Sequence, residues 1–451
     1  MFTEVSIDNF KSIQEAHSIK LRPLTVLVGA NGSGKSNLVK ALSFVSRLCG
    51  DGFIHAITAY GGFTGIAPKA YSPAQARSSR VRIQTRLAVA PPPNYPATLE
   101  KLTAQHDIII GSSRTQEARV VSESVLLRGV LDLERYRSVP DGSDEPEQSL
   151  PSCVKVFREG RKSPAVSWEP AIEEHADRYL TWLGFRRPRS DQDYPIADVL
   201  GSLLRRLTPS NDDLSYETLL AGGTLLPLRY SEHYRQFRYA LRSIRRFDLL
   251  LGTLREPQNP SSETYLLGDG ANLPQRIGEL KRNAAAWGRI SDTLSRICPH
   301  VEDASRRALK TGLNYLEFAE AKAKRRVESW ETSDGTLRAF AILAALESQP
   351  GHSTVMIEEP EQNLHPWAIH AIMDHIRVVI EERDIQVILT THSPQVLEKA
   401  HPDEVLVASR SASSGTHFET LDEILPDADL RMGEVADLWV SGLLRGVPST
   451  E

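Results

Sequence analysis

GANGSGKSN, residues 29–37, fits the pattern G-x-x-x-x-G-K-[ST] of a phosphate-binding loop. The loop follows Leu24–Val28 (LTVLV), a run typical of a strand buried on both faces, and it precedes a helical pattern over residues 35–48. Glycines let main-chain N–H groups turn toward phosphates, and the start of the helix adds positive potential. We therefore expect a nucleotide to be held by Gly29, Ala30, Asn31, Gly32, Ser33, Gly34, Lys35, Ser36 and Asn37.

A second segment, residues 354–361, reads TVMIEEPE, an apolar strand pattern that ends in two adjacent carboxylates. Because parallel strands end at one edge of a sheet, we expect Glu358 and Glu359 to lie beside the phosphate loop. Lys35 would reach the β- and γ-phosphates of ATP, while Ser36 and, through water, Glu358 would hold Mg²⁺. Glu359 would orient or deprotonate the attacking water. Alone, such a strand is commonplace; the upstream loop gives it a catalytic interpretation.

Two further segments carry candidate phosphate ligands. Residues 333–338 read SDGTLR and open a helix, so Ser333, or the aspartate after it, is a plausible N-cap. Alternatively, Ser333 and the Gly335 N–H form a second anion site that completes another subunit's nucleotide site, since one chain needs only one phosphate cradle. Residues 388–394 read ILTTHSP, a buried strand that ends in His392. A lone histidine is more often a packing or surface residue, but at this position His392 could hydrogen-bond the γ-phosphate.

In this order, the four segments resemble ABC-type ATPases of the RecF, SMC and OLD group, which are often called AAA family ATPases. The group's Walker A, signature, Walker B with D-loop, and switch-histidine motifs are similar to residues 29–37, 333–338, 358–366 and 390–394. The opening NFKS at residues 9–12 resembles the group's NF-[KR]-S start, which implies that Lys11 and Ser12 lie near the nucleotide. Residues 267–273 and 438–446 also resemble stretches common in one branch of the group.

The resemblance implies how the chain assembles. Heads of this group sandwich ATP between two copies, so Ser333 and Gly335 would act on the γ-phosphate of a partner subunit in a homo-oligomer. Glu358 replaces the group's more usual aspartate, and the signature reads SDGT where transporters have SGGQ. We therefore expect Mg²⁺ binding to be kept and no membrane partner. The Q-loop glutamine is not placed, and Gln84 and Gln148 are candidates by position only.

The motif order also predicts the fold. Strands alternate with helices after residue 354, which indicates a mostly parallel sheet. By contrast, residues 81–89 and 120–131 alternate apolar and polar residues as β-strands do, and residues 154–157 with 165–168 could form a hairpin. We expect an α/β P-loop ABC-type ATPase head, with a mixed β-sheet and flanking helices, that carries a helical insertion. The predicted ranges are an N-terminal lobe at 1–168, a mainly helical insertion at 169–310 and a C-terminal lobe at 311–451.

Composition narrows the class of protein. The chain has 451 residues, of which 40% are hydrophobic, and a net charge of −5, so a sizeable core is available and a uniformly basic surface is excluded. Its three cysteines form no CxxC pair, which argues against a structural zinc site or a disulfide framework. No apolar run approaches the ~20 residues that span a bilayer. These features favour a cytoplasmic protein.

A basic stripe is the other candidate site. Arg235, Arg238, Arg242 and Arg245 recur at spacings of three and four within a helical pattern over residues 234–251, with tyrosines between them. Such a stripe can follow nucleic-acid phosphates, so DNA is a possible partner. The alternative, which the excess of acidic residues slightly favours, is a solvated or protein-binding face.

As the resemblance implies, we expect an ATP-hydrolysing head that senses DNA or phage and controls a separate effector in a defence system. Too few residues follow His392 for the Toprim nuclease domain that many OLD-type relatives carry, so we expect a Toprim or HNH nuclease to be another protein. One alternative is a nucleotide-gated scaffold that holds a protein partner. Another is a RecF-like DNA repair factor.

Overall fold

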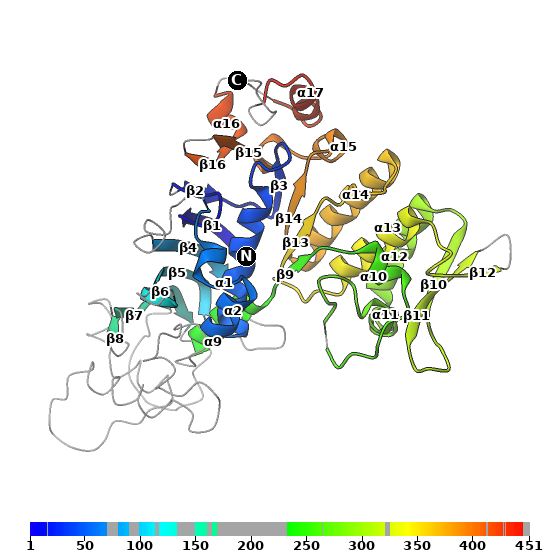
Figure 1. Cartoon of the computed structure of the whole chain (residues 1–451), viewed down its shortest axis with the longest axis horizontal. Coiled ribbons are helices and arrows are strands. Elements are labelled where there is room, and N and C mark those ends of the chain that lie inside the picture. The colour runs from blue at the N-terminus through cyan, green and yellow to red at the C-terminus, as the bar shows by residue number, and fades with distance from the viewer. Residues whose placement is uncertain are drawn as a thin grey trace, which may run out of the picture. The chain divides into compact units, whose positions relative to one another are not determined.

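Two units, each with its own β-sheet, make up the chain (Figure 1). The first unit comprises Met1–Lys20, Lys40–Ser243 and Ser413–Gly415, and the second comprises Leu21–Val39, Ile244–Ala412 and Thr416–Glu451. The computed structural model describes residues 1–15, 17–69, 80–89, 99–112, 117–132, 149–159, 165–168, 232–263, 265–320, 325–411, 414–426, 428 and 430–444.

The second unit contains a six-stranded sheet in the order β16-β15-β3-β14-β13-β9. The five strands from β15 to β9 run parallel to their neighbours. Every residue of β3 and β14 is buried, as their continuous apolar sequences predict. The strands are β3 (Leu24–Val28), β9 (Ile244–Phe247), β13 (Thr354–Glu358), β14 (Gln386–Thr391), β15 (Val405–Ser411) and β16 (Gly415–Thr420).

Helices and a small sheet complete this unit. One apolar core joins the parallel strands to α11–α14 and to the three-stranded antiparallel sheet β10-β11-β12. Helix α13 is buried along nearly its whole length, which explains why its sequence is apolar on all sides. The elements are α10 (Leu251–Arg255), α11 (Leu273–Arg282), α12 (Ala284–Ile297), β10 (Val301–Ala308), β11 (Asn314–Glu320), β12 (Arg325–Glu328), α13 (Asp334–Glu347), α14 (Pro366–Arg383), α15 (Pro394–Leu397), α16 (Leu421–Ile424) and α17 (Glu434–Val440).

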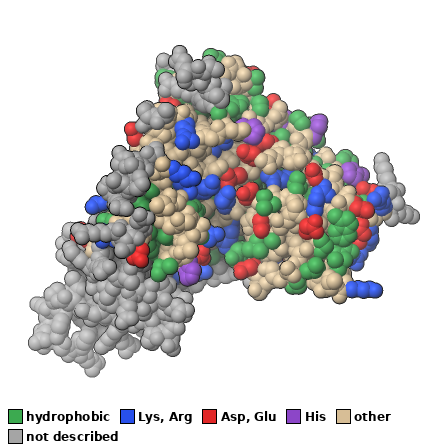
Figure 2. Space-filling view, in the orientation of Figure 1, with side chains coloured by type: hydrophobic (Ala, Val, Ile, Leu, Met, Phe, Trp, Pro, Cys, Tyr) green, Lys and Arg blue, Asp and Glu red, His purple; other side chains and the backbone are tan. Residues whose placement is uncertain are grey.

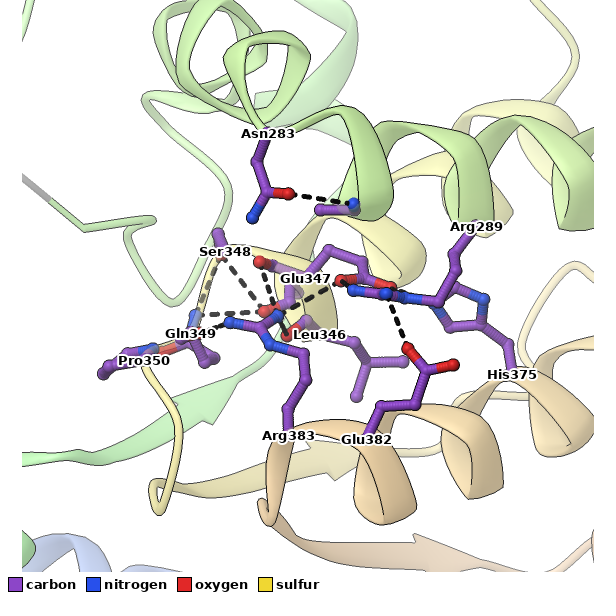
Figure 3. A network of polar contacts seen from close by, with 12 residues as sticks. Asn283, Arg289, Leu346, Glu347, Ser348, Gln349, Pro350, His375, Glu382 and Arg383 are labelled. Atoms are coloured by element: carbon purple, nitrogen blue, oxygen red, sulfur yellow. Dashed lines mark hydrogen bonds and ion pairs between the residues drawn. The ribbon is translucent and has the colours of Figure 1, made fainter. Parts of the chain in front are cut away.

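A buried ionic network fastens three of these helices to one another (Figure 3). Glu347, the last residue of α13, has a fully buried side chain that accepts two hydrogen bonds of 2.7 Å from Arg289 of α12. Arg383, the last residue of α14, donates to the Glu347 main-chain oxygen at 2.7 Å and to its carboxylate at 3.2 Å. Because bidentate pairs of this kind are directional, they fix the position of α13, which begins with the signature segment.

The first unit contains a seven-stranded antiparallel sheet in the order β2-β1-β4-β5-β6-β7-β8. Burial alternates along β4, as its alternating sequence predicts. Phe10, Phe44 and Tyr60 form an aromatic cluster in this unit. Its elements are β1 (Phe2–Asp8), β2 (His17–Lys20), α2 (Phe53–Ala59), α3 (Phe63–Ile66), β4 (Arg80–Val89), β5 (Leu99–Ser112), β6 (Ala118–Asp132), β7 (Ser149–Glu159), β8 (Ala165–Trp168), α9 (Glu232–Arg242) and most of α1 (Lys35–Gly50).

The mixed α/β fold is as predicted, but the chain divides differently from the ranges 1–168, 169–310 and 311–451. Residues 244–310 belong to the same unit as the C-terminal lobe, and β9 pairs with β13 in the parallel sheet. The predicted helix over residues 234–251 ends at Arg242, because residues 244–247 pair with β13 as strand β9. Most of the remaining predicted insertion lies outside the described residues. No described helix is both long and apolar enough to cross a bilayer.

Candidate nucleotide-binding site

The loop between β3 and α1 has the geometry of a phosphate cradle. A Cβ atom at Gly29 would lie 2.3 Å from the Ala408 main-chain oxygen, so only glycine fits there. Gly32 and Gly34 have φ angles of +80° and +107°, the left-handed region that glycine enters without strain. The loop therefore turns its main chain toward the start of α1, at Lys35, where a helix offers unpaired N–H groups to an anion.

Two side chains in the loop fit a phosphate group. Lys35 is buried, and its Nζ donates to Gly29 O at 2.5 Å and Ala30 O at 3.0 Å. Burial lowers the pKa of Lys35, while the negative charges of Glu359 and Glu361 act to raise it. The buried Ser33 Oγ has no hydrogen-bond partner among the described residues. A bound phosphate would give Ser33 a partner and Lys35 a charged one, so the loop fits the nucleotide that its sequence predicts.

The sheet register brings the other motifs to the same edge. Strand β14 lies between β3 and β13, with Thr391 opposite Val28 and Thr390 opposite Glu358. The three strands are parallel, so the loop at residue 29, His392 and Glu359 follow neighbouring strand ends. The prediction that the acidic strand and the histidine strand end beside the phosphate loop is therefore correct.

Glu359 and His392 face each other across this edge. Glu359 has a φ of +46°, a conformation that is uncommon for a residue with a side chain and is concentrated at functional sites. Its main-chain N donates to Thr390 O at 2.8 Å, and Gln362 donates to its carboxylate. His392 Nδ1 lies 3.9 Å from Glu359 Oε1, and both side chains are partly exposed, so a water molecule can reach them.

Glu358, the predicted metal ligand, pairs with a cation of the protein itself. Arg246 Nε of β9 donates to Glu358 Oε1 at 2.5 Å. No group of three or more His, Cys, Asp or Glu side chains in the described part of the chain could hold a metal ion. A metal here would therefore draw on Ser36, Glu358, water and the phosphates of the nucleotide, which is the donor set that Mg²⁺ prefers.

Sequence reasoning missed two residues that join these segments. Glu361 Oε1 accepts from Thr391 Oγ1 at 2.7 Å and from the His392 main-chain N at 3.1 Å, which ties the acidic loop to the histidine loop. Arg338 of α13 is buried and donates to Glu359 O at 3.1 Å. Both were visible in the sequence as members of quoted motifs, but only the fold shows which segments they join.

The signature segment is capped and exposed. Ser333 is the N-cap of α13 and accepts from Thr336 N at 3.3 Å, so its structural interpretation is correct. A Cβ at Gly335 would lie 3.0 Å from Asn363 O of the D-loop segment. Arg255, which sequence reasoning also missed, holds this turn by donating to Thr332 O at 2.8 Å and to the Asp334 carboxylate. Ser333 is exposed, although its hydroxyl also donates to Thr336 Oγ1 at 2.8 Å.

Lys11 and Ser12 lie in the first unit. Lys11 Nζ donates to Gly65 O at 2.5 Å and lies 5.6 Å from the centre of the Tyr60 ring. Burial, together with nearby lysine charges, lowers the pKa of Lys11. Contact of Lys11 and Ser12 with a nucleotide stays a prediction. Of the two glutamine candidates, Gln84 donates to Asp107 at 2.9 Å within the first unit, and Gln148 lies outside the described residues.

The arginine stripe is not a single helical face. Arg238 and Arg242 belong to α9, but Arg245 lies in β9 of the other unit, where its guanidinium is 4.3 Å from the centre of the Tyr265 ring. The prediction that four arginines share one face is therefore wrong, because pairing with β13 converts residues 244–247 to a strand. The side chain of Arg235 lies outside the description. On the face that Figure 2 shows, acidic and basic side chains of the described residues lie interspersed.

Two protein-family models and two relatives match parts of the chain. A family model described as "AAA domain, putative AbiEii toxin, Type IV TA system" matches residues 115–398, and one described as "AAA ATPase domain" matches residues 1–55. The chain is 30% identical to the Old nuclease of Escherichia phage P2 over 77 residues. This aligned region is 17% of this chain and 13% of that protein. It is also 52% identical to an uncharacterised protein of Methanocaldococcus jannaschii over 42 residues, which are 9% of this chain and 13% of that protein. Each match thus spans a small part of the relative's length.

Solved structures of SMC heads are also similar to the chain. A head bound to the C-winged helix domain of ScpA is 15% identical, with 94% of this chain and 99% of that chain covered and a TM-score of 0.41. The head domain from Thermotoga maritima is 11% identical, with 93% and 98% covered and a TM-score of 0.36.

The glycine loop, the acidic strand end and the histidine between them define a P-loop nucleotide-binding protein. Since the first family model covers more than half of the sequence, the chain belongs to that AAA domain family. It is an ABC-type ATPase of the RecF, SMC and OLD group, which confirms the resemblance drawn from its motifs.

Proposed function

We propose that this protein binds ATP with Mg²⁺ and hydrolyses it at the edge of the parallel sheet. The observation that carries the proposal is the register, which aligns Val28, Glu358 and Thr390–Thr391 on three adjacent strands. Lys35 exchanges its main-chain carbonyl partners for the β- and γ-phosphates. Glu359 accepts a proton from the attacking water or orients it, and His392 donates to the γ-phosphate. Ser36 and Glu358 hold the metal, which neutralises phosphate charge when bound.

Binding is tested with a fluorescent ATP analogue. Lys35→Ala removes the charge that faces the phosphates, so we expect its affinity to fall by about a hundredfold or more, as for loss of a charge-assisted contact. Lys40→Ala, one turn further along α1 and outside the glycine loop, is the matched control and should bind as the wild type does. Equal affinity in both variants would contradict the assignment of the loop.

We further propose that two copies close on ATP, with Ser333 and Gly335 of one copy facing the phosphates of the other. The exposure of Ser333 at the start of a 14-residue helix supports this, because that helix end is open to an anion. Analytical ultracentrifugation of Glu359→Gln with Mg²⁺-ATP should show a dimer that disappears in Ser333→Arg. If the measured mass is the same with and without nucleotide, and the same in Ser333→Arg, the proposed dimer around ATP is contradicted.

For the biological role, we propose control of a separate effector, a Toprim or HNH nuclease, in response to DNA or phage. A relative that is named a nuclease and a family described by a toxin–antitoxin system support a defence role. The alternatives are a nucleotide-gated scaffold and a RecF-like repair factor. A scaffold would keep its partner response in Glu359→Gln, because it needs ATP binding only, whereas an effector controlled by turnover would lose it.

A further inference from the structure

Arg246 is a charged residue of the site that the proposed chemistry does not use. It lies in β9, the edge strand of the parallel sheet, where it is opposite Met356 of β13. From there its Nε reaches the Glu358 carboxylate at 2.5 Å, and its Nη2 lies 3.4 Å from Asp248 Oδ2. The Glu358 side chain is 13% exposed and that of Arg246 31%, so the pair is partly shielded from water.

The charges around this pair explain why a cation is needed. Glu358, Glu359 and Glu361 place three carboxylates within four residues. Lys35 donates to the main-chain carbonyls of its own loop, and Arg338 to main-chain oxygens of Leu249, Glu358 and Glu359. Arg246 is therefore the described cation whose ion pair neutralises the Glu358 side chain directly. Without it, a mostly buried carboxylate would be left beside two others.

We propose that Arg246 is a placeholder for the metal: it occupies the Glu358 carboxylate until Mg²⁺ arrives with ATP, and so sets the metal concentration at which the site fills. This inference rests on the proposed function, since it takes Glu358 as a metal ligand. For a metal-bound water to donate to the carboxylate oxygen that accepts from Arg246 Nε, the ion pair must open. Each metal ion therefore binds against the ion pair, and Arg246 is a positioning residue for Glu358.

Neighbouring Arg245 provides a matched control. It lies on the same strand, but its guanidinium stacks on Tyr265 and donates to Ile244 O at 3.0 Å. Replacing it removes the same charge from the same element without touching the contact to Glu358. Arg246→Lys is the conservative variant, because it keeps the charge next to Glu358.

The test is binding of Mn²⁺, followed by electron paramagnetic resonance of the free ion, with ADP present and absent. Arg246→Gln should bind Mn²⁺ about fivefold more tightly than the wild type, the effect of one partly exposed ion pair. Arg245→Gln and Arg246→Lys should stay close to the wild type. Thermal melting of each variant shows whether it is folded. If Arg246→Gln does not fold, Arg246→Lys replaces it in the test, because it keeps the charge. For Arg246→Lys we expect an Mn²⁺ affinity equal to that of the wild type, and a loss of Mn²⁺ binding overturns the proposal.

The outcomes separate this inference from the proposed function. Unchanged or weaker Mn²⁺ binding by Arg246→Gln, with Glu358→Gln still abolishing it, overturns the placeholder alone. Loss of ADP binding in Arg246→Gln would assign Arg246 to the nucleotide instead, which also overturns it. If Glu358→Gln leaves Mn²⁺ binding intact, the metal assignment in the proposed function fails.

Discussion

Glu361 joins two loops of the candidate site. Its Oε1 atom accepts from both Thr391 and His392, so one carboxylate sets the spacing between the acidic loop and the histidine loop. Its side chain is 8% exposed, and its Oε2 is buried without a partner among the described residues. We therefore expect Glu361 to position His392 relative to Glu359.

We expect Glu361→Gln to lower the turnover of ATP by about tenfold to a hundredfold. The neutral amide loses the charge that strengthens the hydrogen bonds from Thr391 and His392, and small displacements of catalytic groups have effects of this size. Affinity for ATP should change little, since the glycine loop is untouched. Steady-state phosphate release and nucleotide binding measure the two effects separately. Glu398→Gln, which removes a surface carboxylate paired with His370, is the control. Equal turnover in Glu361→Gln and the wild type would show that Glu361 does not position the histidine loop.

Glu347 shows how elements are fixed to one another. Burial by itself would raise the pKa of the Glu347 carboxyl, but Arg289 and His375 outweigh burial and hold that pKa at about 2, below the ordinary 4.5. The lowered pKa means that the ion pairs stabilise the fold fully above pH 4.5. Their contribution is lost as the pH falls from 4.5 toward 2.

Between pH 5 and pH 3, protonation of Glu347 in the unfolded chain should therefore remove about 2 kcal/mol from the free energy of unfolding of the second unit. Glu347→Gln should lack that part of the acid dependence and should cost about 3–5 kcal/mol at pH 7, because Arg289 and Arg383 lose a buried partner. Urea unfolding at the two pH values measures both effects. Glu382→Gln removes only the exposed partner of Arg289 and should cost less than about 1 kcal/mol. If Glu347→Gln also lowers the free energy of unfolding by less than about 1 kcal/mol, the ionic network does not stabilise the unit as proposed.

Helix α17 contains the beginning of the sequence stretch 438–446, of which residues 438–444 are described. Trp439 donates its indole N–H to the main-chain oxygen of His392 at 3.2 Å. Gly442, with a φ of +74°, then turns the chain so that Leu444 is fully buried. Helix α17 thus supports the histidine loop through the hydrogen bond from Trp439.

Trp439→Phe keeps the ring and removes the N–H donor, so we expect kcat to fall by about fivefold, the value of one hydrogen bond, with KM unchanged. Trp367→Phe is the matched control, because its indole N–H donates to Arg296 O at 3.3 Å, away from the histidine loop. Steady-state kinetics gives kcat and KM for both variants. An equal fall in kcat in the two would show that α17 does not support catalysis through the histidine loop.

At the scale of the whole molecule, local signals predicted the parts that are continuous in sequence. The buried runs of β3, β13 and β14, with polar residues at their ends, were sufficient to predict one sheet edge with Lys35, Glu359 and His392. Contacts between distant segments were not predictable. Arg246 and Glu358 are 112 residues apart, and a four-residue strand at a sheet edge looks helical when its neighbours are helical. Pairing with β13, and not periodicity, decides the structure of residues 244–247.

The units also divide the sequence in a way that motifs alone do not show. The motifs at residues 29–37 and 333–392 belong to one unit, although their starts, residues 29 and 333, are 304 residues apart. A strand, a loop and a helix suffice to recognise the nucleotide site. The unit that contains it is defined only by long-range contacts.

The measurement that tests the account most directly is phosphate release by wild type and Glu359→Gln at saturating Mg²⁺-ATP, with ATP binding measured on the same samples. Glu359→Gln should bind ATP as tightly as the wild type and release phosphate at least about a hundredfold more slowly, because it loses the group that orients or deprotonates water. Equal rates of phosphate release at equal occupancy would contradict the assignment of Glu359, and with it the claim that this sheet edge is a catalytic site.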